Sequence, residues 1–192
     1  LSNHSSGKMG FALARAAAEA GAETHLVTGP VHLETPDRVR RTDIIRAADM
    51  LEACLAELDH TDIFIACAAV ADYRPRWPAE HKLKKDSGLR ALELEPTPDV
   101  LAQIAASPRR PFSVGFAAET ERVVEHARGK LGRKKLDMIV ANDVSDRSIG
   151  FDSDRNAVTV LWAGGSVEFP AASKLVIAGQ IVGLIAERYR RG

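Results

Sequence analysis

Residues 2–10, which read SNHSSGKMG, carry side chains suited to anion binding. Ser5, Ser6, Gly7 and Lys8 directly precede a predicted helix, and small residues there let backbone N–H groups approach an anion at the positive helix end. The segment is not a P-loop, because Met9 follows Lys8 and no glycine lies five residues before Gly7. A helix N-cap with a glycine turn explains the pattern equally well.

Three further polar segments follow predicted buried strands, at the edge where open α/β sheets bind ligands. After the first of these strands, Ala69 and Ala71 leave room for a flat ligand, and Asp72 suits a base amino group or a metal. Phe116 offers an aromatic face after the second, and Asn142-Asp143 follow the third. The alternatives are a capped strand end for Asp72, core packing for Phe116, and a cap or turn for the Asn-Asp pair.

Lysines occur in two groups that suit phosphate binding. Lys82 lies in a basic run, HKLKK, which fits either a lid that closes over phosphates or a solvated surface loop. Lys130 and Lys134 lie one helical turn apart, so their ammonium groups can face one way and hold a triphosphate. A solvated cationic helix end is the alternative reading.

Alternating strand and helix patterns predict one doubly wound α/β domain with a mostly parallel sheet and a late antiparallel hairpin. Residues 62–67 form a nearly continuous apolar run, which favours a strand buried on both faces. Thr42 or Asp43 is expected to cap a second helix, which extends to Leu58. Thr97 is expected to cap a third helix. The other predicted strands are 24–28, 89–94, 112–116, 138–141, 157–162 and 166–169; the predicted helices are 10–20, 98–106, 119–133 and 172–190.

Composition excludes several classes of function. The 26 basic and 26 acidic residues cancel, so no net field indicates nucleic acid or a membrane surface as a partner. No run of about 18 apolar residues is present, and the N-terminus has no signal-peptide pattern, which favours the cytoplasm. Cys54 and Cys67 are expected to be reduced core thiols. The sequence contains no HxxxH or HExxH pair, so the histidines do not indicate a metal site.

Six motifs in order resemble the phosphopantothenoylcysteine synthetase family, over nearly the whole chain: SNHSSGKMG, AAVADYRP, HKLKK, TPDV, VGFAAET and ANDVS. The resemblance implies a Rossmann-like fold, a homodimer and a two-step ligation in coenzyme A synthesis. The carboxylate of 4′-phosphopantothenate attacks CTP, with Mg²⁺, to give an acyl-cytidylate and pyrophosphate. The amine of L-cysteine then displaces CMP.

The resemblance also implies roles for particular residues. Asn3 matches the catalytic asparagine and Lys82 the flexible-loop lysine, which also contacts CTP. The CTP-binding positions match Asp72, Phe116, Lys130 and Lys134, with Ala69 and Ala71 near the base. Residues Ser5, Ser6, Gly7, Lys8, Asn142 and Asp143 fall in motifs near the substrate and the dimer interface.

The beginning of the chain departs from the family. The family starts with a strand and a glycine-rich loop, whereas Leu1 here precedes the first motif directly. We therefore expect residues 1–192 to be one ligase domain without its first strand. The resemblance also implies an upstream flavin-dependent decarboxylase domain in the full-length protein, so no flavin is expected here.

Two other classes of function remain as alternatives. The fold class suits an NAD(P)-dependent oxidoreductase, but no GxGxxG follows a strand, and Trp77 stands where a Tyr-Lys reductase pair starting at Tyr73 needs lysine. A non-catalytic nucleotide-binding module is the second alternative. The residues also leave CTP and ATP open as the nucleotide.

Overall fold

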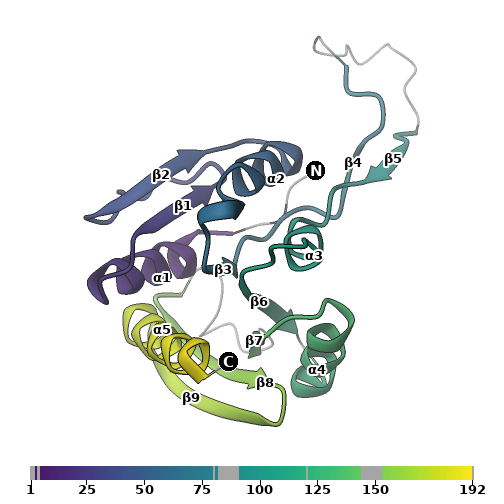
Figure 1. Cartoon of the computed structure of the whole chain (residues 1–192). Coiled ribbons are helices and arrows are strands. Elements are labelled where there is room, and N and C mark those ends of the chain that lie inside the picture. The colour runs from purple at the N-terminus through teal and green to yellow at the C-terminus, as the bar shows by residue number, and fades with distance from the viewer. Residues whose placement is uncertain are drawn as a thin grey trace.

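A five-stranded sheet forms the centre of the molecule (Figure 1). The computed structural model describes residues 3, 5–79, 81, 91–119, 121–143 and 153–191, with only the backbone at positions 119 and 143. The strand order is β3 (Ile63–Ala66), β6 (Phe112–Glu119), β7 (Met138–Asp143), β8 (Arg155–Trp162) and β9 (Gly165–Ser173). The first three strands are parallel, and the last two add an antiparallel hairpin. The predicted late hairpin is therefore confirmed.

Two smaller strand pairs accompany the central sheet. Strands β1 (Thr24–Thr28) and β2 (Val39–Asp43) pair in parallel, and β4 (Tyr73–Pro75) and β5 (Leu94–Pro96) pair in antiparallel. Among the described strands, β1 pairs only with β2 and β3 only with β6. Val27 of β1 and Phe64 of β3 nevertheless contribute to the same apolar cluster, so the two parallel sheets are neighbours that share no hydrogen-bonded edge.

Helices cover both faces of the central sheet, which confirms the doubly wound, Rossmann-like prediction. Helices α1 (Lys8–Glu19) and α5 (Lys174–Arg191) pack together on one face, and α3 (Val100–Ala105) and α4 (Val123–Arg133) cover the other (Figure 1). Helix α2 (Ala47–Ala56) and the short 3₁₀ helix η1 (Leu58–His60) complete the chain order. Every described helix is too short or too polar to cross a membrane.

Side-chain alternation along the strands builds these two layers. In β7, Met138 and Val140 join the cluster beneath α1 and α5, whereas Ile139 and Ala141 face α3 and α4. All four are essentially inaccessible to solvent. A strand buried on both faces explains why this stretch shows no polar alternation.

The second predicted helix starts later than expected, because Thr42 and Asp43 belong to β2. Strand β2 reads VRRTD and pairs in register with β1, and the Thr42 hydroxyl lies 2.8 Å from the His25 ring nitrogen. Helix α2 begins at Ala47, where the Asp49 carboxylate accepts the Arg46 N–H at 3.1 Å. The sequence pattern missed β2 because a short polar strand has no apolar run.

Several other features also differ from the predictions. The side chains of β3 pack into the clusters on both faces, as predicted, but they are only half-buried, and the strand pairs with a described strand on one edge only. Asp99, not Thr97, caps α3 by accepting the Ala102 N–H at 3.0 Å. Strand β6 continues to Glu119, so α4 begins at Val123 rather than at residue 119. Strand β4 was not predicted, and β5 begins only at Leu94, where the expected strand ends.

Candidate functional site

The carboxyl ends of β3, β6 and β7 lie along one rim of the sheet, because these strands are parallel and hydrogen-bonded in that order. Residues 67–72 follow β3, and Ala118 pairs with Asn142 where β6 and β7 end. The antiparallel strand β8 begins at this same rim. Three of the predicted polar segments are thereby directed to one edge of the molecule.

The N-terminal segment reaches this rim through a glycine turn. Gly7 precedes α1 with a left-handed φ of 74°, and its carbonyl accepts the Phe11 N–H at 3.0 Å. This positive φ favours glycine, and a Cβ at Gly7 would also lie 3.0 Å from Val31 Cγ1, so a larger residue would need Val31 to shift. The Asn3 amide nitrogen donates to the Val70 carbonyl at 3.0 Å, which places the predicted catalytic asparagine beside residues 69–72.

Lys8 is directed to the start of β8 rather than to the Asn3 segment. Its ammonium group lies 2.6 Å from Asp154 Oδ1, and this hydrogen bond lowers the pKa of the Asp154 carboxyl. Ser5 is exposed and its hydroxyl accepts the Gly7 N–H at 3.4 Å, whereas Ser6 is half-buried. Lys8 therefore joins the N-terminus of α1 to the far side of the rim.

Residues 97–99 connect the exit from β3 to α4. The Thr97 N–H donates to the Asp72 carbonyl at 2.9 Å, and the Thr97 hydroxyl donates to the Ala71 carbonyl. Asp99 Oδ2 in turn lies 2.6 Å from the Lys134 ammonium group. A continuous set of contacts thus links Asn3, residues 70–72, residues 97–99 and Lys134.

Asp99 combines a helix cap with an ion pair. Burial opposes its ionisation, but hydrogen bonds from Lys134 and from the Ala102 N–H outweigh burial, so the pKa of Asp99 is lowered. The carboxylate is ionised at neutral pH and fixes the position of the Lys134 side chain, which is 20% exposed. The sequence interpretation missed this role, although the TPDV motif contains both Thr97 and Asp99.

The two lysines at the end of α4 have different partners, and their shared role in holding a triphosphate stays a prediction. Lys130 donates to the Phe116 carbonyl at 3.0 Å, while Lys134, the residue that ends the helix, reaches Asp99. Each ammonium group has an oxygen partner. An ammonium group has three N–H donors, so phosphate oxygens can join or replace these partners without leaving the charge unpaired.

The remaining predicted site residues divide between described and undescribed parts of the chain. Ala69, Ala71 and Phe116 are half-buried, Asp72 is exposed, and Asn142 ends β7 half-buried. Lys82 and the Asp143 side chain lie outside the described residues. The structure therefore links most predicted positions at one rim without placing Lys82.

The cysteines do not contribute a nucleophile to this rim. Cys54 and Cys67 are both free thiols, as predicted. Burial raises the pKa of Cys54 to about 11 and that of Cys67 to about 12, so both remain protonated at neutral pH.

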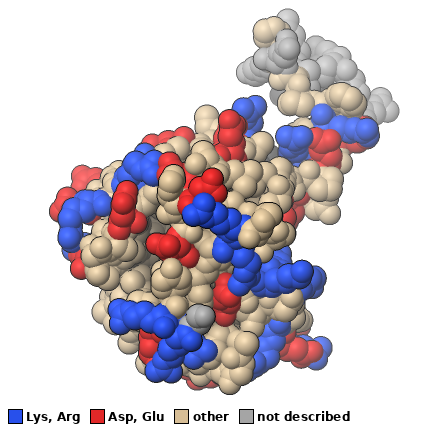
Figure 2. Space-filling view, in the orientation of Figure 1, with Lys and Arg blue, Asp and Glu red and all other residues tan. Residues whose placement is uncertain are grey.

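Within the described ranges, no three His, Cys, Asp or Glu side chains gather as a metal site. Figure 2 shows basic and acidic side chains interspersed over the visible face, in line with the zero net charge.

Comparison with protein families identifies the chain. The model of the DNA/pantothenate metabolism flavoprotein C-terminal domain family matches residues 1–189. The chain belongs to this family. The match covers the N-terminal segment, the residues 97–99 connection and both α4 lysines, so the whole candidate site lies within the family domain.

Similar proteins support this membership. The coenzyme A biosynthesis bifunctional protein CoaBC of Vibrio cholerae is 51% identical over 191 residues, covering 98% of this chain and 48% of that protein. The protein of the same name from Escherichia coli K12 is 46% identical over 193 residues, covering 98% and 48%. The chain thus spans about half the length of the curated relatives it matches.

A solved structure gives the same result for the fold. The C-terminal domain of a coenzyme A biosynthesis bifunctional protein CoaBC superposes with a TM-score of 0.83 at 37% identity. The match covers 99% of this chain and 86% of the other. The arrangement of layers described above is therefore the one found in this family.

Proposed function

We propose that this chain is a phosphopantothenate–cysteine ligase, which joins 4′-phosphopantothenate to L-cysteine with CTP in coenzyme A biosynthesis. Family membership supports this proposal, as does the name of the relatives, which are coenzyme A biosynthesis proteins. The observation that carries it is the contact set joining Asn3, residues 70–72, residues 97–99 and Lys134 at one rim. Within the part of the rim that the structure describes, no feature specifically favours an oxidoreductase.

The first chemical step forms an acyl-cytidylate. A carboxylate oxygen of 4′-phosphopantothenate bonds to the α-phosphorus of CTP, the bond between that phosphorus and the bridging oxygen breaks, and pyrophosphate leaves. Negative charge grows on the α-phosphate and on the leaving group, so fixed cations lower the barrier. Lys130 and Lys134, held by oxygen partners beside β6 and α3, suit the outer phosphates. The resemblance matches Lys82 to the flexible-loop lysine, whose ammonium group would neutralise the negative charge that develops during the attack.

The second step forms the amide bond. The cysteine amine bonds to the acyl carbon, gives up a proton, and CMP departs with the former carboxylate oxygen. An oxyanion develops on the acyl oxygen, and a neutral amide N–H is a suitable donor to it. Asn3 is the candidate donor, because the resemblance matches it to the catalytic asparagine and its amide nitrogen lies at this rim. Exchange of the Val70 carbonyl for the oxyanion would preserve its hydrogen bonding.

Mg²⁺ is part of the proposal as a companion of the triphosphate. This ion is usually held by substrate phosphates, water and one or two carboxylates, rather than by a full set of protein ligands. The exposed carboxylate of Asp72 fits such a partial donor set, in keeping with the absence of a three-ligand cluster from the described residues. When bound, the ion neutralises phosphate charge.

We also propose that a further parallel strand completes the sheet. In the described structure, β1 and β3 each have one edge with no paired strand, although Val27 and Phe64 share an apolar cluster. A strand between them would pair with both edges and explain the half-buried β3. The family domain of known structure is longer than the region matched here, so it has residues available for such a strand.

The assembly of the full-length protein is likewise a proposal. We place the protein in the cytoplasm, as a homodimer, with a flavin-dependent decarboxylase domain upstream. Support for the dimer comes from the exposed large apolar side chains on and next to the paired strands β4 and β5, among them Tyr73 at 55% and Leu94 at 43% exposure, since such exposure marks interaction surfaces. Sedimentation at several concentrations tests the dimer, and a monomer at every concentration would contradict it.

The deciding assay measures pyrophosphate release by the full-length protein with each substrate omitted in turn. We expect release only when 4′-phosphopantothenate and the nucleotide are both present, and amide product only when L-cysteine is added. Replacing CTP with ATP tests the nucleotide preference. Turnover of NAD(P)H without pyrophosphate would favour the oxidoreductase alternative, and nucleotide binding without either reaction would favour a non-catalytic module.

A further inference from the structure

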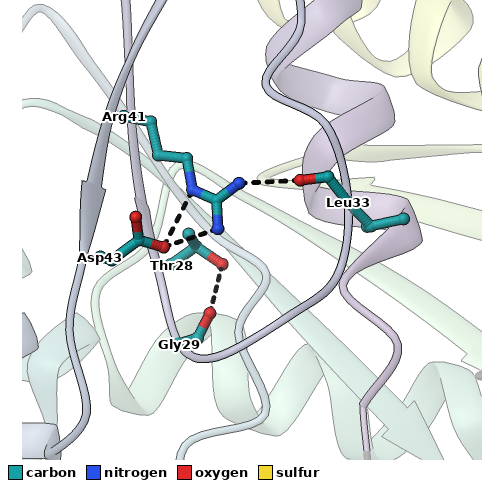
Figure 3. Close-up of polar contacts among 5 residues, drawn as sticks. All are labelled: Thr28, Gly29, Leu33, Arg41 and Asp43. Atoms are coloured by element: carbon teal, nitrogen blue, oxygen red, sulfur yellow. Dashed lines mark hydrogen bonds and ion pairs between the residues drawn. The ribbon is translucent and has the colours of Figure 1, made fainter.

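Arg41 of β2 makes three kinds of contact with its single guanidinium group, and Figure 3 shows two of them, the contacts with Asp43 and Leu33. Its Nε and Nη2 lie 2.9 and 2.6 Å from Asp43 Oδ1, and its Nη1 donates to the Leu33 carbonyl at 2.8 Å. The guanidinium carbon also lies 5.3 Å from the centre of the Phe11 ring. The Arg41 side chain is only 18% exposed, whereas its partner Asp43 is 63% exposed, so the guanidinium lies mostly within the protein and the carboxylate faces solvent.

These contacts involve two residues next to Gly7, Leu33 and Phe11. Leu33 lies in the segment between β1 and β2, and a Cβ built at Gly7 would lie 3.5 Å from Leu33 Cδ1. Phe11 donates its N–H to the Gly7 carbonyl in the first turn of α1. Arg41 thus contacts the residue on each side of the glycine turn from which the Asn3 segment departs.

We propose that Arg41 is a positioning residue for the segment that carries Asn3, acting through Leu33 and Phe11. The inference rests on the proposed function, since Asn3 is assigned there to amide formation. A planar guanidinium can bind a carboxylate, donate to a carbonyl in another direction and stack on a ring at the same time. A lysine ammonium cannot do all three, so the contacts are specific to arginine.

The neighbouring residue Arg40 provides a matched control. It lies on the same strand but faces the opposite side, where its Nη1 lies 2.8 Å from Glu57 Oε1. It is exposed, and neither Gly7 nor Leu33 is among its hydrogen-bond partners. Arg40→Ala therefore removes an arginine and one carboxylate partner, as Arg41→Ala does, while leaving the glycine turn unchanged.

The test follows one turnover in the full-length protein with CTP, 4′-phosphopantothenate and L-cysteine. Chemical quenching gives the ratio of acyl-cytidylate to amide product. We expect Arg41→Ala to raise the peak ratio about tenfold, because a displaced Asn3 slows only the second step. Arg41→Lys, which keeps the charge but not the planar fork, is expected to raise it by a smaller factor, and Arg40→Ala to leave it unchanged.

The ratio separates positioning from stability, because it does not depend on the fraction of folded enzyme. Leu33→Ala removes the side chain that borders the space beside Gly7 while retaining the backbone carbonyl that accepts from Arg41, so it is a second route to the same increase if Arg41→Ala folds poorly. A wild-type ratio in Arg41→Lys and Leu33→Ala, with active enzyme, would overturn the inference and leave the ligase proposal intact. Wild-type protein that forms neither intermediate nor product would instead contradict the proposed function.

Discussion

Thr97→Val tests whether residues 97–99 hold the exit from β3 in place for nucleotide binding. Valine has nearly the same shape as threonine but has no hydroxyl, so it removes the bond to the Ala71 carbonyl and retains the N–H bond to Asp72. The carbonyl is part-buried and would lose its side-chain donor. The substitution is therefore a local change at the predicted base-binding segment.

The expected magnitude follows from the partial burial of this bond. Loss of a donor to a part-buried carbonyl costs about 1–2 kcal/mol, and a domain of this size loses about 2–4 °C of Tm for each kcal/mol. Displacement of Ala71 and Asp72 should also weaken nucleotide binding, since about 1.4 kcal/mol corresponds to a tenfold change. We expect the KM for CTP to rise about five- to tenfold, with a smaller change in kcat.

Thr24→Val is the matched control for this experiment. The Thr24 hydroxyl also donates to a backbone carbonyl, that of Ala22, at 3.2 Å, but this bond is exposed to solvent. Water can replace that bond, so the free energy of unfolding should change by less than about 0.5 kcal/mol. Thermal denaturation and pyrophosphate release measure both variants. The reasoning would be refuted if the Thr97 variant matched the Thr24 variant in both Tm and KM.

Four further predictions concern stability and the two chemical steps. Asp99→Asn keeps the helix cap but removes the ion pair. Because folding lowers the pKa of Asp99, the ion pair contributes to stability above the usual pKa of the carboxyl, near 3.8. This contribution is lost as the pH falls below that value. Since the pair is partly exposed, the variant should be less stable than wild type by about 0.5 kcal/mol at pH 7 and equally stable near pH 2. Denaturant titrations measure this difference, and the same difference at both pH values would contradict the prediction. Lys82→Ala should slow pyrophosphate release about a hundredfold, measured in single turnover, and an unchanged rate would remove its assigned role. Asn3→Asp should accumulate acyl-cytidylate, detected by mass spectrometry after acid quench, whereas normal product formation with no accumulation would exclude Asn3 from the second step. Gly115→Ala should cost about 1–3 kcal/mol, because its Cβ would lie 2.8 Å from Leu136 Cδ1, while Gly129→Ala in α4 meets open space and should not destabilise; equal denaturation midpoints would refute the packing argument.

The sequence predicted the central sheet well because its strands are apolar and continuous. Strands β6 and β7 are buried by helices on both faces, so their residues show the expected apolar runs. The β8–β9 hairpin was predicted from the turn at residues 163–165, and Gly164 does adopt a left-handed φ of 81° there. The convergence of residues 69–72, Phe116 and Asn142 followed from the parallel order of three strands.

Short-range patterns could not predict the features that depend on long-range pairing. Strand β2 is polar and is fixed by its register with β1, so it resembles a helix cap in sequence. The contacts of Thr97 with Ala71 and Asp72 join residues about 25 positions apart, and the partner of Lys134 is a helix cap on another element. Local propensity favours a cap at either Thr97 or Asp99, and only the tertiary contacts assign the two residues different roles.

The most direct test of the proposed reaction follows the carboxylate oxygen atoms. In the full-length protein, 4′-phosphopantothenate labelled with oxygen-18 in its carboxylate is converted with CTP and L-cysteine, and the products are weighed by mass spectrometry. Attack of the carboxylate on the α-phosphorus predicts one labelled oxygen in CMP and one in the new amide. Label in inorganic phosphate or pyrophosphate, or amide formation with unlabelled CMP, would contradict the acyl-cytidylate and with it the assignments of Lys82 and Asn3.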